Sequence, residues 1–156
     1  RIISMIYFIF SILDFNNSEK NLHLDSFYLN FSGTHGSLAS RDGKELKYIS
    51  NGCQIRDGDG NLLINGDSIN FDTDGFWQDE CNIENSFSAY IFENHGVMLP
   101  DVTNENKAAF FHVERLRDKV WTSEFRVSYI DCHRVTVKNK ILIANTLWFS
   151  PLLIRQ

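Results

Sequence analysis

The chain lacks the sequence signatures that most often reveal an enzyme. It contains no G-x-G-x-x-G, no phosphate-binding P-loop and no G-x-S-x-G nucleophile elbow. Its five histidines form no H-x-x-x-H or H-x-H pair, the spacings that bring two imidazoles to one metal ion. We therefore expect no cofactor and no metal, and we favour a protein without catalytic activity.

Cysteine is also scarce. Cys53, Cys81 and Cys132 are an odd number at wide spacing, and no two of them form a C-x-x-C pair. Such a set is a poor disulfide framework and a poor zinc site, so we predict free thiols in a reducing compartment. A single disulfide with one thiol left over is the alternative.

An excess of positive charge is missing too. The chain has 15 basic and 20 acidic residues, which gives a net charge of -5. Nucleic acids and anionic membrane surfaces attract cationic proteins, so we expect neither as a partner, and a basic protein partner fits this charge better. With 156 residues and 43% hydrophobic content, the chain is expected to fold as a single domain over 1–156.

The chain also lacks an apolar run long enough to cross a bilayer as a helix. Residues 2–13 are apolar except for Ser4 and Ser11, with Arg1 before them and Asp14 after them, as at the start of a secretory signal. The run is too short for a membrane span, and no small-x-small cleavage site follows it. We predict a buried central strand here and a cytoplasmic protein. A secreted protein is the alternative if the run is a targeting segment.

The strongest pattern that the chain does contain lies between residues 124 and 149. Apolar and polar residues alternate there in three short stretches, which gives each stretch one buried face, as in a β-strand. The alternating apolar residues are Phe125, Val127, Tyr129, Val135, Val137, Ile141, Ile143, Leu147 and Phe149. Reversals are expected at 131–133 and 138–139, which predicts a C-terminal three-strand antiparallel meander.

Residues 103–121 carry the one helical pattern. Ala109, Val113, Leu116 and Val120 recur at steps of three and four residues, and the threonine at the start of the segment can cap a helix. Shorter apolar runs upstream are separated by Asp-Gly and Asn-Gly turn signals, which predict hairpins. The sequence therefore predicts an α+β fold: a mostly antiparallel β-sheet, curled, sandwich-like or barrel-like, with this helix packed on it.

One Asp-Gly-Asp-Gly-Asn stretch imitates part of a calcium loop. Asp57, Asp59 and Asn61 have the alternate spacing of its oxygen ligands. Leu62 and Ser68 stand where the pattern requires Gly and Glu. We predict a hairpin turn at this stretch and no calcium site.

Acidic residues gather around a tryptophan in the segment 72–84. Paired carboxylates beside an aromatic ring are typical of glycosidases, but acidic loops with a tryptophan also occur on protein surfaces without such a role. We take the segment as the candidate binding site, formed by Asp72, Asp74, Trp77, Asp79 and Glu80.

These features favour an interaction protein that recognises another macromolecule through acidic loops and a sheet face. The alternative is a small-ligand carrier or a small hydrolase whose pocket lies in a curled antiparallel sheet. Such a pocket would be lined by aromatic side chains, namely Phe27, Tyr28, Phe31, Tyr90, Phe92, Tyr129 and Trp148.

Overall fold

The computed structural model describes residues 10–14, 21–25, 29, 35–71, 75–81, 96–115 and 122–147, and the structural statements below concern this part of the chain. Its strands are β1 (Phe10–Asp14), β2 (Asn21–Asp25), β3 (Gly36–Ala39), β4 (Leu46–Ser50), β5 (Ile55–Asp57), β6 (Gly96–Pro100), β7 (Lys107–Arg115), β8 (Thr122–Asp131) and β9 (Arg134–Leu147). A short helix, α1, covers Phe76–Cys81. All strand pairs are antiparallel, which confirms the predicted mostly antiparallel α+β fold.

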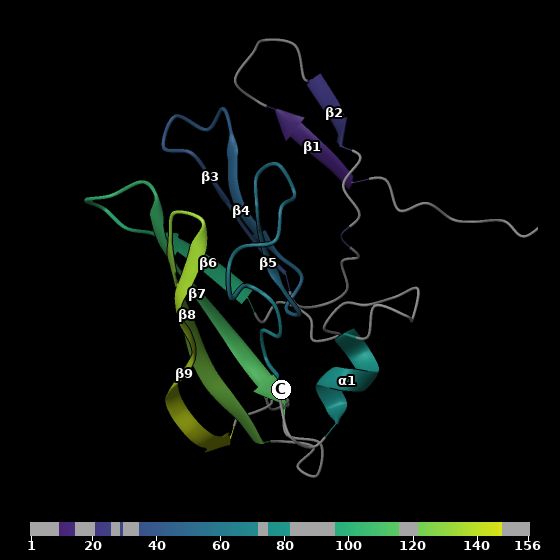
Figure 1. Ribbon diagram of the computed structural model, residues 1–156, viewed down its shortest axis with the longest axis vertical. Helices are drawn as coiled ribbons and strands as arrows, with labels where there is room; N and C mark the ends of the chain where they lie inside the picture. The colour runs from purple at the N-terminus through teal and green to yellow at the C-terminus, as the bar shows by residue number, and fades with distance from the viewer. Residues whose placement is uncertain are drawn as a thin grey trace, which may run out of the picture.

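Two sheets form the body of the described structure (Figure 1). One has the order β3-β4-β5 and the other the order β6-β7-β8-β9, and the described strands do not close into a barrel. The sheets meet where β3 lies beside β6. Glycine is required there, because a Cβ on Gly96 would lie 2.7 Å from the carbonyl oxygen of His35, and one on Gly36 would lie 2.8 Å from the Phe110 ring.

The apolar core lies between these two sheets. Its buried side chains come from both sheets and from the connection after β5: Tyr48, Ile55, Leu63, Ile69, Met98, Ala108, Phe110, Ile130 and Val135. Residues paired across strands lie on the same face, so Ala108, Ile130 and Val135 form one row across β7, β8 and β9. We call the side of the four-stranded sheet that carries this row its inner face.

The helix predicted at 103–121 is wrong over the described part, because residues 107–115 form strand β7, and residues 116–121 lie outside the described residues. The Asp101 carboxylate accepts hydrogen bonds from the backbone N–H of Thr103 and Asn104, so the expected capping residue belongs to a turn. In β7 the inward positions after Phe110 are His112 and Glu114, both buried. These polar residues hid the two-residue period of the strand and imitated the polar face of a helix.

The C-terminal meander is antiparallel, as predicted, but its described part has two strands, β8 and β9, where three were predicted. A turn at 131–133 joins β8 to β9, as predicted, and Cys132 has a positive φ of 56°. Asn139 also has a positive φ, 54°, yet no reversal occurs there. Tyr129 pairs with Val137 and Val127 pairs with Lys140, so two residues of β9 face one of β8. The signal at 138–139 therefore marks a β-bulge inside one long strand.

Strand β1 forms an antiparallel hairpin with β2 and, within the described ranges, pairs with no other strand. Figure 1 shows this hairpin apart from the two larger sheets. The prediction that residues 2–13 form a central strand is wrong for residues 10–13, and residues 2–9 lie outside the described residues. Of the helices in the described ranges, none has the length and hydropathy that a membrane crossing requires.

Candidate functional site

Three of the five predicted binding residues lie on helix α1. Asp79 is exposed, whereas Trp77 and Glu80 are half-buried. Asp72 and Asp74 lie outside the described residues. The structure therefore brings Trp77, Asp79 and Glu80 together within two helical turns.

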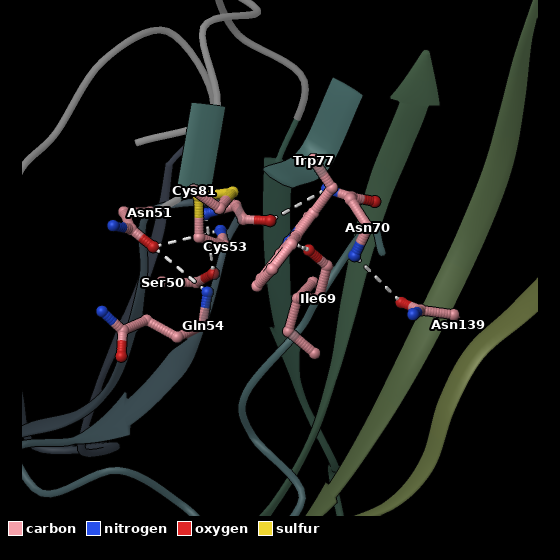
Figure 2. The surroundings of a disulfide bond; sticks show 10 residues. Ser50, Asn51, Cys53, Gln54, Ile69, Asn70, Trp77, Cys81 and Asn139 are labelled. Atoms are coloured by element: carbon pink, nitrogen blue, oxygen red, sulfur yellow. Dashed lines mark hydrogen bonds between the residues drawn. A yellow bond between two sulfur atoms is a disulfide. The ribbon is translucent and has the colours of Figure 1, made fainter. Parts of the chain in front are cut away.

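Trp77 anchors α1 to the rest of the protein. Its ring Nε1 donates a hydrogen bond of 2.8 Å to the carbonyl oxygen of Ile69, and its centroid lies 5.4 Å from that of Phe71. It also packs against the buried pair Cys53 and Cys81 (Figure 2). These contacts make Trp77 a packing residue, with only part of its ring left at the surface.

Cys53 and Cys81 form a disulfide, with 5.5 Å between their Cα atoms. The prediction of free thiols is wrong for these two residues, and the alternative of one disulfide with one remaining thiol is confirmed. Cys132 is exposed and unpaired in the β8–β9 turn. The Asn51 side chain holds the backbone at Cys53 in place, because its Oδ1 accepts hydrogen bonds from the backbone N–H groups of Cys53 and Gln54.

The calcium-like stretch is a turn, as predicted. The Asp57 carboxylate accepts hydrogen bonds from the backbone N–H groups of Asp59 and Asn61, at 3.0 and 2.8 Å. Gly60 supplies the positive φ, 85°, that closes the turn. The side chain of Asp57 is thus used to stabilise the backbone of the turn.

A polar cluster that the sequence analysis missed lies on the inner face of the four-stranded sheet. Glu114 of β7 pairs in register with Glu124 of β8, and the guanidinium of Arg126 forms ion pairs with both carboxylates. The Glu114 side chain is 1% exposed and that of Arg126 is 14% exposed. A buried carboxylate pair requires such a cation, because two like charges out of water repel each other and lose their hydration.

His112 extends this cluster toward the disulfide. Its Nδ1 lies 2.5 Å from Asn70 Oδ1, and its Nε2 lies 3.1 Å from Ser128 Oγ. Asn70 Nδ2 donates to the carbonyl oxygen of Gly52, which directs Oδ1 at the imidazole. Since Oδ1 can only accept, we assign the proton to Nδ1, and Nε2 accepts from the Ser128 hydroxyl. Burial and the nearby Arg126 charge lower the pKa of His112 to about 3, so the ring is neutral at pH 7.

Asn70 and Ser128 connect this histidine to strand β9. Figure 2 shows Asn70 next to Trp77, with its backbone N–H bonded to the Asn139 side chain. The backbone N–H of Asn139 donates in turn to Ser128 Oγ. The bulge at Asn139 therefore supplies both a donor and an acceptor to the cluster.

The order Ser128, His112, Asn70 is that of a nucleophile, a base and an orienting group. All three residues have no exposed surface, and the Ser128 oxygen already accepts a backbone hydrogen bond. A substrate cannot reach the hydroxyl in this conformation. The cluster as it stands is an interior hydrogen-bond network that fixes the relative positions of β7, β8, β9 and the 65–71 segment.

The structure places one of the predicted pocket residues at the surface. Tyr129 is 39% exposed and lies on the face of the sheet opposite the core, while the other six aromatic residues proposed to line a pocket lie outside the described residues. A hollow of about 430 Å³ occurs elsewhere, near the β3–β4 turn. It is lined by polar and charged residues: Ser40, Arg41, Asp42, Glu45, Lys47 and Glu105. This lining differs from the aromatic pocket that a carrier of apolar ligands would need.

The outer face of the four-stranded sheet carries exposed apolar side chains. Leu99, Ala109, Tyr129 and Val137 are paired in register, so they form one row across β6, β7, β8 and β9. Leu99 is 50% exposed and Val137 is 43% exposed. Val97, 54% exposed, and Ile143, 50% exposed, lie on the same face in adjacent rows. We call this set of six residues the outer apolar face.

Two stacked phenylalanines lie on the same side of the sheet as the outer apolar face, because Phe111 pairs with Val97 and Phe125 pairs with Ile143. Phe111 and Phe125 have ring centroids 6.0 Å apart and an interplanar angle of 21°, and both are half-buried. Phe111 pairs with Val127, which is fully buried. This side of the sheet is therefore covered at Val127 and exposed at Leu99, Tyr129 and Val137.

Comparison of the chain with protein-family models, with curated proteins and with solved structures gave no match in any of the three.

Proposed function

We propose that this chain is a non-enzymatic interaction protein whose partner, another protein, docks on the outer apolar face. The observation that carries the proposal is the row Leu99, Ala109, Tyr129 and Val137, which is apolar across all four strands and exposed at three positions. Contiguous exposed apolar patches are uncommon on soluble monomers and often mark protein contacts. A tyrosine among them is typical of the centre of such an interface.

The acidic residues are the second part of this proposal. Asp79 and Glu80 of α1, together with Asp72 and Asp74, would meet basic groups of the partner. Such charges increase the rate of association and the selectivity for the partner more than they increase affinity. The outer apolar face would provide most of the binding free energy, since burial of apolar surface is the main favourable contribution in protein association.

The disulfide favours an oxidising compartment for this function. Cys53 and Cys81, the last residue of α1, are both buried, and stable disulfides are rare in reducing cytosol. We therefore prefer the secreted or otherwise exported protein over the cytoplasmic one that the cysteine spacing had favoured. An exported protein would meet its partner outside the cytosol.

The experiment uses a double variant that carries both Leu99→Lys and Val137→Lys. Its control is the single variant Val102→Lys. Val102 is 83% exposed in the β6–β7 connection, outside the outer apolar face. We expect the wild-type protein and the control to capture the same partners from an extract of the source organism, and the double variant to lose at least one, as measured by quantitative mass spectrometry. All three proteins should show the same cooperative thermal unfolding. Retention of every partner by a folded double variant would refute the role of this face.

A further inference from the structure

We infer that the occupant of the outer apolar face is a second copy of this chain, which lies with its four strands in reverse order over those of the first. The inference rests on the proposed function, because it names the partner of the same face. Two copies related by a two-fold axis present the same surface to each other, so that surface must complement itself. Helix α1 contributes no residue to this face, so its acidic residues remain a separate part of the proposed function.

A two-fold axis along the strand direction, above the middle of the four-stranded sheet, sets the order of the facing strands. The middle of the sheet lies between β7 and β8. Strand β6 of one copy therefore faces β9 of the other, and β7 faces β8, while each cross-strand row stays opposite its own equivalent. Antiparallel sheets commonly pack face to face in this aligned way, with their strands within about 30° of each other.

Side chains of unequal size face each other in the apolar row. Ala109 of one copy lies opposite Tyr129 of the other, as the register of β7 and β8 requires. Leu99 lies opposite Val137 of the second copy by the same rule. The small alanine leaves room for the tyrosine ring, which is 39% exposed in the single chain, so the two layers can interdigitate. An axis across the strands would instead place tyrosine on tyrosine.

The charged row at the end of the apolar row complements itself as well. Its members alternate in sign across the sheet: Asp101, Lys107, Asp131 and Arg134. In the reversed order, Lys107 of one copy faces Asp131 of the other. Asp101 faces Arg134 in the same way, so every facing pair joins opposite charges. The side chains of Lys107 and Asp131 form an ion pair within the chain but stay 44% and 43% exposed, which leaves them accessible to a second copy.

The row on the other side of the apolar row contains one exposed cation, Lys140, in register with Val127. In the reversed order Lys140 faces Val97, on the edge strand of the other copy. Its methylene groups can cover Val97 while its ammonium group stays in water at the rim. Four strands make the face only roughly 15–20 Å wide. We therefore expect a reversible dimer, because small interfaces are typical of weak complexes.

The test measures self-association of the purified chain by sedimentation velocity over a series of concentrations. All proteins carry Cys132→Ser, so that the exposed thiol cannot link two chains. We expect a monomer–dimer equilibrium for this parent and for the control Val102→Lys, whose position is outside the face. The double variant with Leu99→Lys and Val137→Lys brings like charges together at both contacts, so its dissociation constant should rise at least about 10-fold.

A second double variant, with Leu99→Lys and Val137→Glu, tests the reversed order of the strands. The two positions lie on the opposite edge strands β6 and β9, three strand spacings or roughly 14 Å apart, so they do not touch within one chain. In the reversed order the lysine of one copy faces the glutamate of the other. This variant should therefore dimerise at low salt and dissociate as added salt screens the pair. An axis across the strands would place lysine on lysine and abolish the dimer.

Thermal unfolding of both double variants should match that of the parent, which shows that they fold. Equal loss of the dimer in the two double variants would overturn the reversed order. A dimer that persists unchanged in both would place self-association elsewhere on the chain and refute the inference. A parent that stays monomeric up to millimolar concentration would also refute it. The proposed function would survive that last result if the lysine double variant still loses a different protein from the extract.

Discussion

The two faces of the β6–β9 sheet differ, and each departs in part from the usual distribution of side chains, since the inner face adds a polar cluster to the core row Ala108, Ile130 and Val135. The inner face, which contacts the core, carries His112, Glu114, Arg126 and Ser128 next to Phe110. The outer face carries an apolar row from Leu99 to Val137 that is largely exposed. The usual expectation for a half-buried antiparallel sheet is apolar residues inside and polar residues outside.

The difference between the two faces indicates that buried polar groups and exposed apolar groups are stabilised in different ways on one sheet. Buried polar groups are tolerated when each finds a partner, and the inner cluster satisfies its members with ion pairs and hydrogen bonds. Exposed apolar groups cannot be stabilised by such pairing, and only contact with another surface removes them from water. The charges of the inner face are thus neutralised within the chain, whereas the outer face leaves apolar side chains in water that the proposed partner would cover.

The largest effect is expected from removal of the inner cation. Arg126→Met leaves Glu114 and Glu124 paired in register without a positive charge between them. We expect the free energy of unfolding at pH 7 to fall by about 3–5 kcal/mol, because breaking a buried ion pair leaves an uncompensated charge. Urea denaturation followed by tryptophan fluorescence measures this loss.

The matched control for this change is Lys140→Met, an exposed cation on β9. We expect it to change the free energy of unfolding by less than about 0.5 kcal/mol. If Arg126→Met were as stable as this control, the inner cluster would not stabilise the fold, and the contrast between the two faces would disappear.

The sequence could predict β8 and β9 better than β7. In β8 and β9, the alternation from Phe125 to Val137 predicts strands and the turn at 131–133, and the structure confirms both. The predicted single buried face is wrong for Val135 and Val137, because a register shift puts Val135 on the inner face and Val137, 43% exposed, on the outer face. In β7, His112 and Glu114 stand at inward positions, so the same period was hidden. The cluster that makes these positions acceptable depends on pairing with residues of β8, which no local pattern reveals.

The disulfide and the candidate binding site show the same limit. Cys53 and Cys81 are separated by 28 residues and meet only because α1 packs against the loop before β5. This helix has six residues, too few for a hydrophobic period to be recognised. The composition of the acidic segment pointed to Trp77, but its hydrogen bond to Ile69 could be found only from the three-dimensional structure.

A smaller effect tests the two faces with neighbouring residues of one strand. Val135 is 1% exposed on the inner face, and Val137 lies two residues further on the outer face. Val135→Ala should lower the free energy of unfolding by about 2 kcal/mol, because it leaves a cavity in the core. Val137→Ala should change it by less than about 0.5 kcal/mol.

Chemical denaturation of the two valine variants under identical conditions provides the comparison. The midpoint, with an unchanged slope, reports the difference in stability. Equal losses in the two variants would mean that the outer apolar face is already covered within the isolated chain. The docking proposal would then lose its main support.

The smallest effect on stability is expected from the acidic residues. Replacement of Asp72, Asp74, Asp79 and Glu80 by alanine should leave thermal unfolding nearly unchanged, since surface substitutions are usually within about 0.5 kcal/mol. It should instead slow association with a basic partner, and added salt should reduce the difference from the wild type, because salt screens exposed charges.

Trp77→Ala is the contrasting variant. It removes the hydrogen bond to Ile69 and the packing on Cys53 and Cys81, so it should lower the free energy of unfolding. A quadruple variant that keeps every partner at the wild-type association rate would show that the outer apolar face acts alone.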